Sequence, residues 1–284
     1  MTILAMVCAA TAGAGRARAQ SQASSEIPLT DPEPGARRDT VTIGAGIALL
    51  PSYEGSNDYV VIPAGALRGT VSGFSFSSRG TELSLDLIRD TGSLDFQAGP
   101  VVAVNFNRVG RIVDDRVEAL GSRKVALELG GYVGLAKTGV VTSAYDTLAI
   151  SVSYRRDVAG IHGSYIIEPS ISYGTPLSRK SFVGIGASAT LAGDGYARSY
   201  FAVDPAGSLR SRLPTFAAPR GGFKDFTLSG LASYSLSGDL RRGPALFALG
   251  SYSRLQGDFA LSPVTSIAGS RAQLFGAIGI GYTF

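Results

Sequence analysis

The sequence has 284 residues, a formal net charge of +4 at pH 7, 45% hydrophobic residues and only 17% charged ones. Its length allows one large domain or two ordinary ones. Basic and acidic residues interleave without a long basic block, which argues against a nucleic-acid-binding protein. Because no uninterrupted apolar stretch reaches roughly 18 residues, a transmembrane helix is not expected.

The first residues are typical of an exported protein. Residues 1–19 have a short apolar core and end in Ala17-Arg18-Ala19, which predicts a signal peptide. Cys8, the one cysteine, lies inside this segment, so we expect a mature chain without disulfides or thiol chemistry. Residues 20–39 are rich in Ser, Pro, Glu and Arg, have no apolar period, and are predicted to form a disordered periplasmic leader.

From Thr40 onward apolar residues alternate with small or polar ones, as Val41, Ile43, Ala45 and Ile47 do. Among the further segments with this alternation are 82–87, 94–106, 124–135, 148–155, 165–173, 183–191, 226–236 and 273–284. Period two, sustained over many short segments, predicts an all-β, single-chain antiparallel transmembrane barrel spanning residues 40–284.

The strand number follows from a count of these segments. About eleven are recognisable, and single-chain bacterial barrels have an even number of strands. Val60 to Ser78, with Leu67, Phe74 and Phe76, fits either one strand or two. We therefore predict twelve strands, with ten as the alternative.

The last segment is expected to close the barrel. In Gln273–Phe284, one face carries Leu274, Ile278, Ile280 and Tyr282, which we expect to contact lipid. The segment resembles the C-terminal signal read by the barrel assembly machinery, with Ile278, Ile280, Tyr282 and Phe284 as its residues. We expect it to pair with Thr40–Leu50, because an open sheet edge is not tolerated in a bilayer.

The connections between segments alternate in length. Residues 107–123, 194–223 and 257–271 form long connections, whereas 177–181 and 237–244 are short. Outer-membrane barrels have long extracellular loops and short periplasmic turns. We therefore expect the long connections outside the cell and Phe284 at the periplasmic rim. The sequence leaves open whether 194–223 plugs the lumen or faces outward.

The inward positions of the predicted strands carry charges of both signs. They are Arg68, Glu82, Asp86, Asp95, Lys124, Glu128, Arg155 and Glu168. In a narrow barrel these charges should pair and, with Tyr132, Phe182 and Phe275, partly close the lumen. Such a charge network either holds the barrel in shape or lines a selective pore for small solutes.

Several motifs occur in a fixed order along the chain. They are Pro51–Tyr59 with Tyr53, Glu54, Gly55, Ser56, Asp58 and Tyr59; Gly160-Ile161-His162-Gly163; Tyr196–Phe201 with Tyr200 and Phe201; Tyr252–Asp258 with Arg254 and Asp258; Ser262-Pro263; and Gly281–Phe284. Together they resemble the MltA-interacting protein (MipA/OmpV) family of outer-membrane proteins, over Thr40 to Phe284. Ala202 departs from the pattern, since the family usually has Gly there, and the loop after Phe201 differs.

The resemblance implies a non-enzymatic protein of the bacterial outer membrane, in contact with its lipid and lipopolysaccharide. The role it implies is that of a scaffold linking a lytic transglycosylase, which hydrolyses murein, to a murein synthase. Other family members are described as adhesins or as influencing antibiotic uptake. The family pattern names no partner-binding residues, and it implies no catalytic residue, cofactor or metal.

Two alternatives rest on particular residues. The segment from Tyr53 to Tyr59 either folds over the barrel mouth through side-chain hydrogen bonds or uses Glu54 and Asp58 to hold a divalent cation or a glycan. His162, the one histidine, would need a nearby nucleophile and an orienting acid for acyl transfer, and no G-x-S-x-G pattern supplies them. Two other functions remain as alternatives to the scaffold: a small-solute channel, which the inward charges could line, and an outer-membrane hydrolase, which would use His162.

Overall fold

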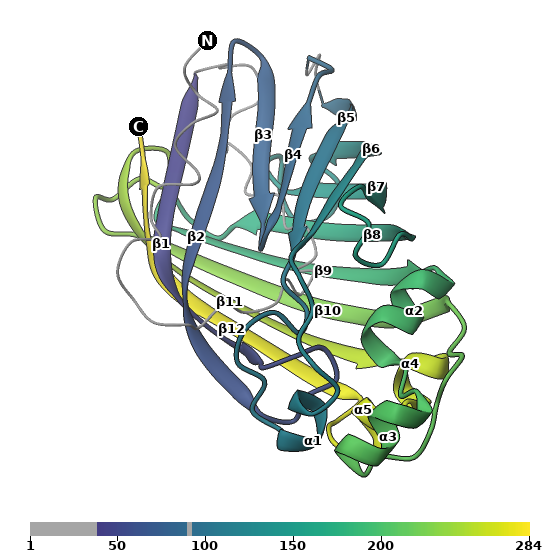
Figure 1. Cartoon of the computed structure of the whole chain (residues 1–284). Helices are drawn as coiled ribbons and strands as arrows, with labels where there is room; N and C mark the ends of the chain where they lie inside the picture. Colours follow the sequence, from purple (N-terminus) through teal and green to yellow (C-terminus); the bar gives the residue numbers. More distant parts are fainter. Residues whose placement is uncertain (1–38, 90–92) are drawn as a thin grey trace.

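The computed structural model describes residues 39–89 and 93–284, and within them twelve strands close into one barrel. Every neighbouring pair is antiparallel, and each strand bonds to the strands next to it in the chain (Figure 1). The predicted fold class and the count of twelve are confirmed. The predicted signal peptide and leader, up to residue 38, lie outside the described residues; Asp39 accepts a hydrogen bond from the Ser72 amide at 2.8 Å.

The strands are mostly 11 to 14 residues long, which suits a bilayer crossing at a tilt. They are β1 (Thr40–Pro51), β2 (Tyr59–Val71), β3 (Phe74–Arg79), β4 (Glu82–Asp86), β5 (Leu94–Asn105), β6 (Ala126–Thr138), β7 (Thr147–Asp157), β8 (Tyr165–Pro176), β9 (Ser181–Ala192), β10 (Gly222–Ser235), β11 (Gly243–Leu255) and β12 (Ala272–Thr283). The helices are α1 (Asp115–Glu118), α2 (Asp194–Phe201), α3 (Pro205–Ser211), α4 (Gly257–Leu261) and α5 (Pro263–Ser266).

The ambiguous stretch from Val60 to Ser78 is a hairpin of two strands. Ser72 and Gly73 connect β2 to β3, with φ angles of 54° and 82°. Two successive positive φ angles define the tight hairpin turn whose twist matches that of the strands. Because this turn divides the stretch into β2 and β3, the barrel has twelve strands in the described part of the chain.

The barrel closes where β12 pairs with β1, as predicted. The register runs from Thr42 opposite Thr283 to Leu49 opposite Gly276. The Phe284 amide then donates to the Val41 carbonyl at 2.9 Å. The first and last strands thus satisfy one another's backbone groups, which a bilayer requires.

The outer face of the barrel is apolar. Ile43 and Ile47 on β1 and Ile278 and Ile280 on β12 each leave 52–58% of their surface exposed. Leu274 and Tyr282 point the same way, so the predicted lipid-facing set is confirmed. Among the described residues no helix is both long and apolar enough to cross a membrane. The strands make the crossing.

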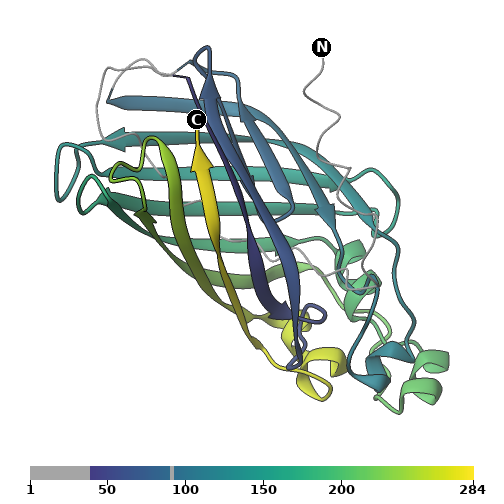
Figure 2. The ribbon, with the colours of Figure 1, turned by 90° about the vertical axis from the view of Figure 1, so that its left-hand side faces the viewer.

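The two ends of the barrel differ. We call the end formed by 52–58, 106–125, 193–221 and 256–271 the loop end, and the end formed by 72–73, 139–146, 177–180 and 236–242 the turn end. All five helices lie at the loop end, and the chain terminates at the turn end (Figures 1 and 2). The connections predicted to be long lie at the loop end and those predicted to be short lie at the turn end, although 158–164, also at the loop end, is shorter than 139–146 at the turn end. The helices within the long connections were not predicted.

The closing seam generates a test. A Cβ atom on Gly46 would lie 2.1 Å from the Ile278 carbonyl oxygen and 2.8 Å from the Gly279 Cα. Because both are backbone atoms, Gly46→Ala should force β1 and β12 apart and lower the free energy of unfolding by about 1–3 kcal/mol. Urea denaturation of the refolded barrel measures this. Gly276→Ala is the matched control, since a Cβ there meets nothing within 4 Å; equal stability of the two variants would contradict the prediction.

Candidate functional site

A helical cap covers the mouth of the barrel at the loop end. Helix α2, from the long connection 194–223, buries Tyr196, Tyr200 and Phe201. The Phe201 and Tyr196 rings lie 5.2 and 6.5 Å from the ring of Phe259 on α4. Figure 1 shows α2 and α4 side by side at this end. The question left open by the sequence is therefore answered: this connection closes the mouth.

A second apolar cluster joins the remaining loop-end segments around Tyr53. The Tyr53 side chain is fully buried, and its hydroxyl donates to the Ala268 carbonyl at 2.8 Å. The cluster comprises Tyr53, Ile112, Val117, Leu120, Val203, Leu213, Val264 and Ala268, with Phe216 packed against it. Burial, and then the nearby Asp114 carboxylate, raise the pKa of the Tyr53 phenol. Tyr53 is thus the anchor of the first loop.

Most of the motif residues join segments of this cap. The Ser262 hydroxyl donates to the Phe201 carbonyl at 2.6 Å and accepts from the Val264 amide, and Pro263 begins α5. Asp258 accepts from the Arg220 amide at 2.7 Å, and Tyr59 accepts from the Leu274 amide at 3.1 Å. Arg254 is exposed and lies outside these contacts.

The motif glycine and serine of the first loop are fixed to the last strand. Gly55 has a φ of +95°, and its amide donates to Gln273 Oε1 at 3.0 Å. Ser56 is fully buried and forms a β-bridge with Gly269. The Asp58 amide donates to the Ser56 hydroxyl at 3.0 Å. These bonds hold the turn so that Glu54 points into the barrel.

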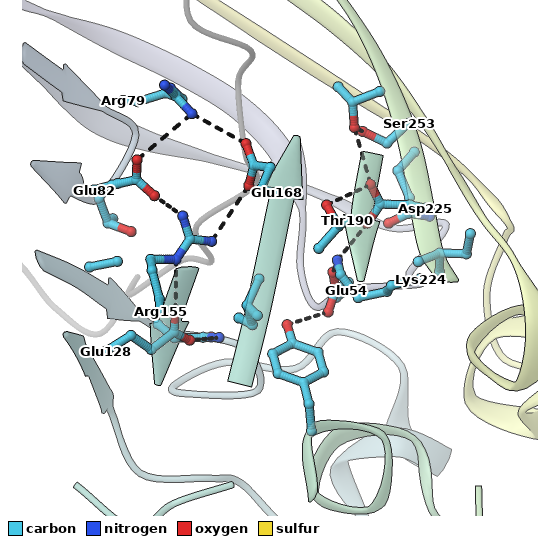
Figure 3. A pocket seen from close by; sticks show the side chains of 18 residues that line it. Glu54, Arg79, Glu82, Glu128, Arg155, Glu168, Thr190, Lys224, Asp225 and Ser253 are labelled. Carbon is cyan, nitrogen blue, oxygen red and sulfur yellow. Dashed lines mark hydrogen bonds and ion pairs between the residues drawn. The ribbon is translucent and has the colours of Figure 1, made fainter. Parts of the chain in front are cut away.

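Beneath the cap, Arg155 on β7 lies at the centre of a buried charge cluster. Its guanidinium contacts Glu128 on β6 at 3.3 Å, Glu168 on β8 at 3.5 Å, and Glu82 on β4 (Figure 3). Arg79 adds contacts of 3.7 Å to Glu82 and 3.2 Å to Glu168. Four of the eight predicted lumen charges, Glu82, Glu128, Arg155 and Glu168, therefore meet at one level of the barrel.

Lys224 on β10 organises the other half of the cluster. Its ammonium pairs with Asp225 at 2.6 Å and with Glu54, which descends from the first loop (Figure 3). Glu54 also accepts from the Tyr196 hydroxyl at 2.7 Å and from Asn107 Nδ2 at 3.0 Å. One carboxylate therefore ties three loop-end segments to the barrel wall.

These contacts decide between the two interpretations of the first loop. The Glu54 carboxylate is taken up inside the mouth by an ammonium, a phenol and an amide, so the loop folds over the mouth through side-chain bonds. Among the residues that the structure describes, no group of three or more His, Cys, Asp or Glu side chains is placed to hold a metal ion. Because Glu54 is engaged by these partners, the alternative in which it and Asp58 hold a cation or a glycan is not favoured.

Three members of the cluster escaped sequence reasoning. Lys224 and Asp225 are neighbours and yet both buried, because a β-bulge between Phe223 and Asp225 shifts the register against β9. Strict alternation would send one of the two outward. Arg79 was missed because it ends β3, directly after the stretch whose strand count was ambiguous.

The cluster closes the lumen at this level. Its lining includes five carboxylates (Glu54, Glu82, Glu128, Glu168 and Asp225) and three cations (Arg79, Arg155 and Lys224), a formal excess of two negative charges. The space left between the side chains is about 50 Å³, enough for only one or a few water molecules. In this conformation paired side chains leave little free space at this level, and the formal charge of the cluster disfavours anions.

His162 belongs to the cluster as an anchor. It is buried, with Nε2 3.3 Å from Glu128 Oε1, and Nδ1 accepts the Ser164 amide proton at 3.2 Å. Its ring lies edge-on to Tyr196 at 5.1 Å. A general base needs a ring nitrogen directed at a nucleophile, whereas both nitrogens here are bonded to structural groups. His162 therefore supports α2 by packing against Tyr196.

The other predicted lumen charges lie elsewhere. Asp86 accepts from the Ala98 amide at 3.1 Å, and Asp95 accepts from Gln97 at 2.8 Å, both nearer the turn end. Arg68 lines a separate cavity together with Phe182 and Phe275. The prediction that Lys124 faces the lumen is wrong: it is exposed in the connection before β6, because the strand begins only at Ala126.

Comparison with known families now decides the relationship. The family described as MltA-interacting protein MipA matches residues 43–284. The chain belongs to the MipA family. A comparison with curated proteins finds no match.

Several solved barrels align with this MipA-family chain. The NanC porin is 10% identical with a TM-score of 0.45, covering 86% of this chain and 98% of its own. The COG4313 outer membrane channel from Pseudomonas putida F1 is 13% identical with a TM-score of 0.48, covering 91% of this chain and 100% of its own. The CymD monoaromatic hydrocarbon channel is 11% identical with a TM-score of 0.39, covering 87% of this chain and 89% of its own. At such values these likenesses carry no inference about function.

Because Arg155 is shared by three carboxylates, we predict that replacing it strongly destabilises the barrel. Arg155→Met should leave Glu82, Glu128 and Glu168 short of their shared cation and lower the free energy of unfolding by about 3–5 kcal/mol. Urea denaturation in lipid vesicles measures the loss. Arg156→Met is the matched control, since Arg156 is the next residue of β7 and points outward. An equal effect of both variants would show that the cluster does not stabilise the barrel.

Proposed function

We propose that this chain is a non-enzymatic scaffold of the bacterial outer membrane that binds a lytic transglycosylase and a murein synthase at its turn end. Barrels of this kind place short turns in the periplasm, and murein and its enzymes occupy that compartment. The loop end then faces outward, among lipopolysaccharide. The description of the family as MltA-interacting supports a murein-hydrolase partner.

The observation that carries the proposal is the closed lumen. A channel needs a continuous aqueous path, whereas here Arg155, Lys224 and their carboxylates fill the barrel beneath α2. Conduction would require buried ion pairs to separate, which costs several kcal/mol per uncompensated charge. A binding role uses the barrel as it stands.

The turn end offers a preorganised surface for a partner. In the connection 139–146, the Asp146 carboxylate accepts hydrogen bonds from the Val140 amide at 2.6 Å, the Val141 amide at 2.9 Å and the Tyr173 hydroxyl at 2.9 Å. Burial opposes ionisation, but the amide hydrogen bonds prevail and hold the pKa of Asp146 well below its usual range. Val141 is left 70% exposed on this fixed turn. A fixed turn loses little entropy on binding.

The strand that closes the barrel supports a further part of the proposal. Ile278, Ile280 and Tyr282 face outward on the turn-end half of β12, and Phe284, directly after the strand, is also exposed. The Tyr282 and Phe284 rings lie 4.7 Å apart. We propose that these side chains are read by the barrel assembly machinery before β12 pairs with β1.

Retention of partners tests the scaffold. The immobilised, refolded protein is expected to retain a purified lytic transglycosylase and a murein synthase. Val141→Glu should weaken retention about tenfold, because it places a charge on an apolar contact. Leu209→Glu is the control, since Leu209 is 85% exposed on α3 at the opposite end. Failure of the unmodified protein to retain either enzyme would overturn the scaffold.

Planar-bilayer recording tests the closed lumen. The unmodified protein is expected to show no steady conductance. Glu54→Ala removes the carboxylate that joins the first loop to Tyr196 and Lys224, so transient openings should become more frequent. Glu118→Ala, an exposed acid at the same end, should change nothing. Steady, solute-selective conductance of the unmodified protein would instead assign it as a channel.

A further inference from the structure

A second space occupies the lumen between the charge cluster and the turn end. We call it the turn-end cavity; its volume is about 320 Å³, within the size range of small-ligand sites. One wall is apolar, formed by inward side chains of β9 to β12 and β2. These side chains include Phe182, Phe247, Phe275 and Ala277.

The rest of the lining is mostly small or hydroxyl-bearing, but its charged residues are all basic. They are Arg68, Arg79, Arg179 and Arg241, and none of the described lining residues is a carboxylate. Arg79 and Arg241 have acidic partners nearby, Glu168 at 3.2 Å and Asp239 at 3.3 Å. Arg179 is exposed in the connection 177–180, so it stands at the entrance from the turn end. An apolar wall beside arginines is complementary to an amphiphile with one negative charge.

The barrel wall is interrupted next to this cavity. Strand β2 pairs with β3 only from Arg68 to Val71, and in the described chain the stretch from Tyr59 to Leu67 has no strand partner on that side. Figure 1 shows β3 and β4 ending about halfway along the neighbouring strands. Pro63 suits this free edge, because proline in a strand has no N–H to offer a partner.

The cavity reaches the interruption. Its lining includes Gly65 and Leu67 from the free edge of β2, and Ser78 and Gly80 from the tip of the β3–β4 hairpin. Leu67 and Ser78 are joined there by a hydrogen bond from the Leu67 amide at 2.7 Å. Because β2 lies in the lipid-facing wall, this part of the cavity lies beside the part of the wall that faces the membrane.

We propose that the turn-end cavity binds a long-chain fatty acid, which enters from the membrane between β2 and the β3–β4 hairpin. The acyl chain lies along Phe182, Phe247 and Phe275, and the carboxylate binds arginines at the turn end. Moving an acyl chain from lipid into an apolar cavity gains little by itself, because both surroundings are apolar. The carboxylate–guanidinium contact therefore decides the affinity. This inference is independent of the scaffold proposal.

The chain has no tryptophan, which permits a direct test on the full-length, membrane-reconstituted protein. Phe247→Trp places one fluorophore in the cavity, and a brominated stearic acid serves as the quencher. Quenching is expected to saturate. The control is Phe96→Trp on the outward face of β5, where Phe96 is 59% exposed; there quenching should rise without saturation as the quencher fills the bilayer. Indistinguishable curves at the two positions would overturn the proposal.

Three comparisons on the Phe247→Trp protein test the binding geometry. The methyl ester of the same acid should bind at least about tenfold more weakly than the free acid. The Arg179→Gln variant should bind the free acid at least about tenfold more weakly, whereas Lys180→Gln, a change at the neighbouring residue, should leave the affinity unchanged. Ala277→Phe, which fills the cavity, should abolish saturation, whereas the outward Ala248→Phe should not. Heat-dependent gel mobility verifies that each variant is folded. Equal binding of acid and ester, or saturation that persists in Ala277→Phe, would contradict the proposal.

Discussion

The structure depends on one constraint: inside a bilayer every backbone N–H and C=O must find a partner within the protein. The pairing of β1 with β12 meets it by removing the edges that the first and last strands would otherwise present. Gly46 and Gly279 allow this close approach, because a side chain at either position would strike the backbone of the opposite strand. The apolar outer face and the twelve-strand circumference follow from this closure.

Closure also creates the interior that the charges occupy. Isolated charges in such an interior are costly, and they are tolerated only when paired. Arg155 draws together carboxylates from β4, β6 and β8, and Lys224 binds a carboxylate that is 170 residues away in the chain. The contacts of Arg155 join neighbouring strands along the inner wall, whereas Arg79 joins β3 to Glu168 on β8, and Glu54 joins the first loop to β10. They therefore fix the cross-section of the barrel and the position of the cap together.

The lumen is consequently asymmetric along its axis. Toward the loop end it is filled by an acidic cluster under packed aromatic rings, and toward the turn end it is an apolar space bordered by arginines. The short β3–β4 hairpin adds a sideways asymmetry, because it leaves part of β2 without a strand partner among the described residues, which is a departure from the continuous pairing seen at the β1–β12 seam. The lumen is therefore filled toward the loop end and offers space for a ligand toward the turn end. That arrangement favours binding at the turn end and from the membrane over flow through the barrel.

The alternation of side chains determined the fold class, most of the strand positions and the lipid-facing residues. These are local or nearly local properties: a strand shows one face to lipid, and the period of two records it directly. Glu82, Glu128, Arg155 and Glu168 were recognisable as inward for the same reason.

Only the tertiary structure decided which of these charges meet and what covers them. The sequence did not predict that Lys224 and Asp225 both face inward, because this depends on a β-bulge. Lys124 was wrongly assigned to the lumen because β6 begins two residues later. The role of Glu54 depends on its contact with Lys224, which is far away in the chain. The helices of the cap are four to eight residues long, too short to carry a periodic signal of their own, and they form where packing against Tyr53, Tyr200 and Phe259 stabilises them. Periodicity reports on the surroundings of each strand, whereas these features depend on residues far away in the chain.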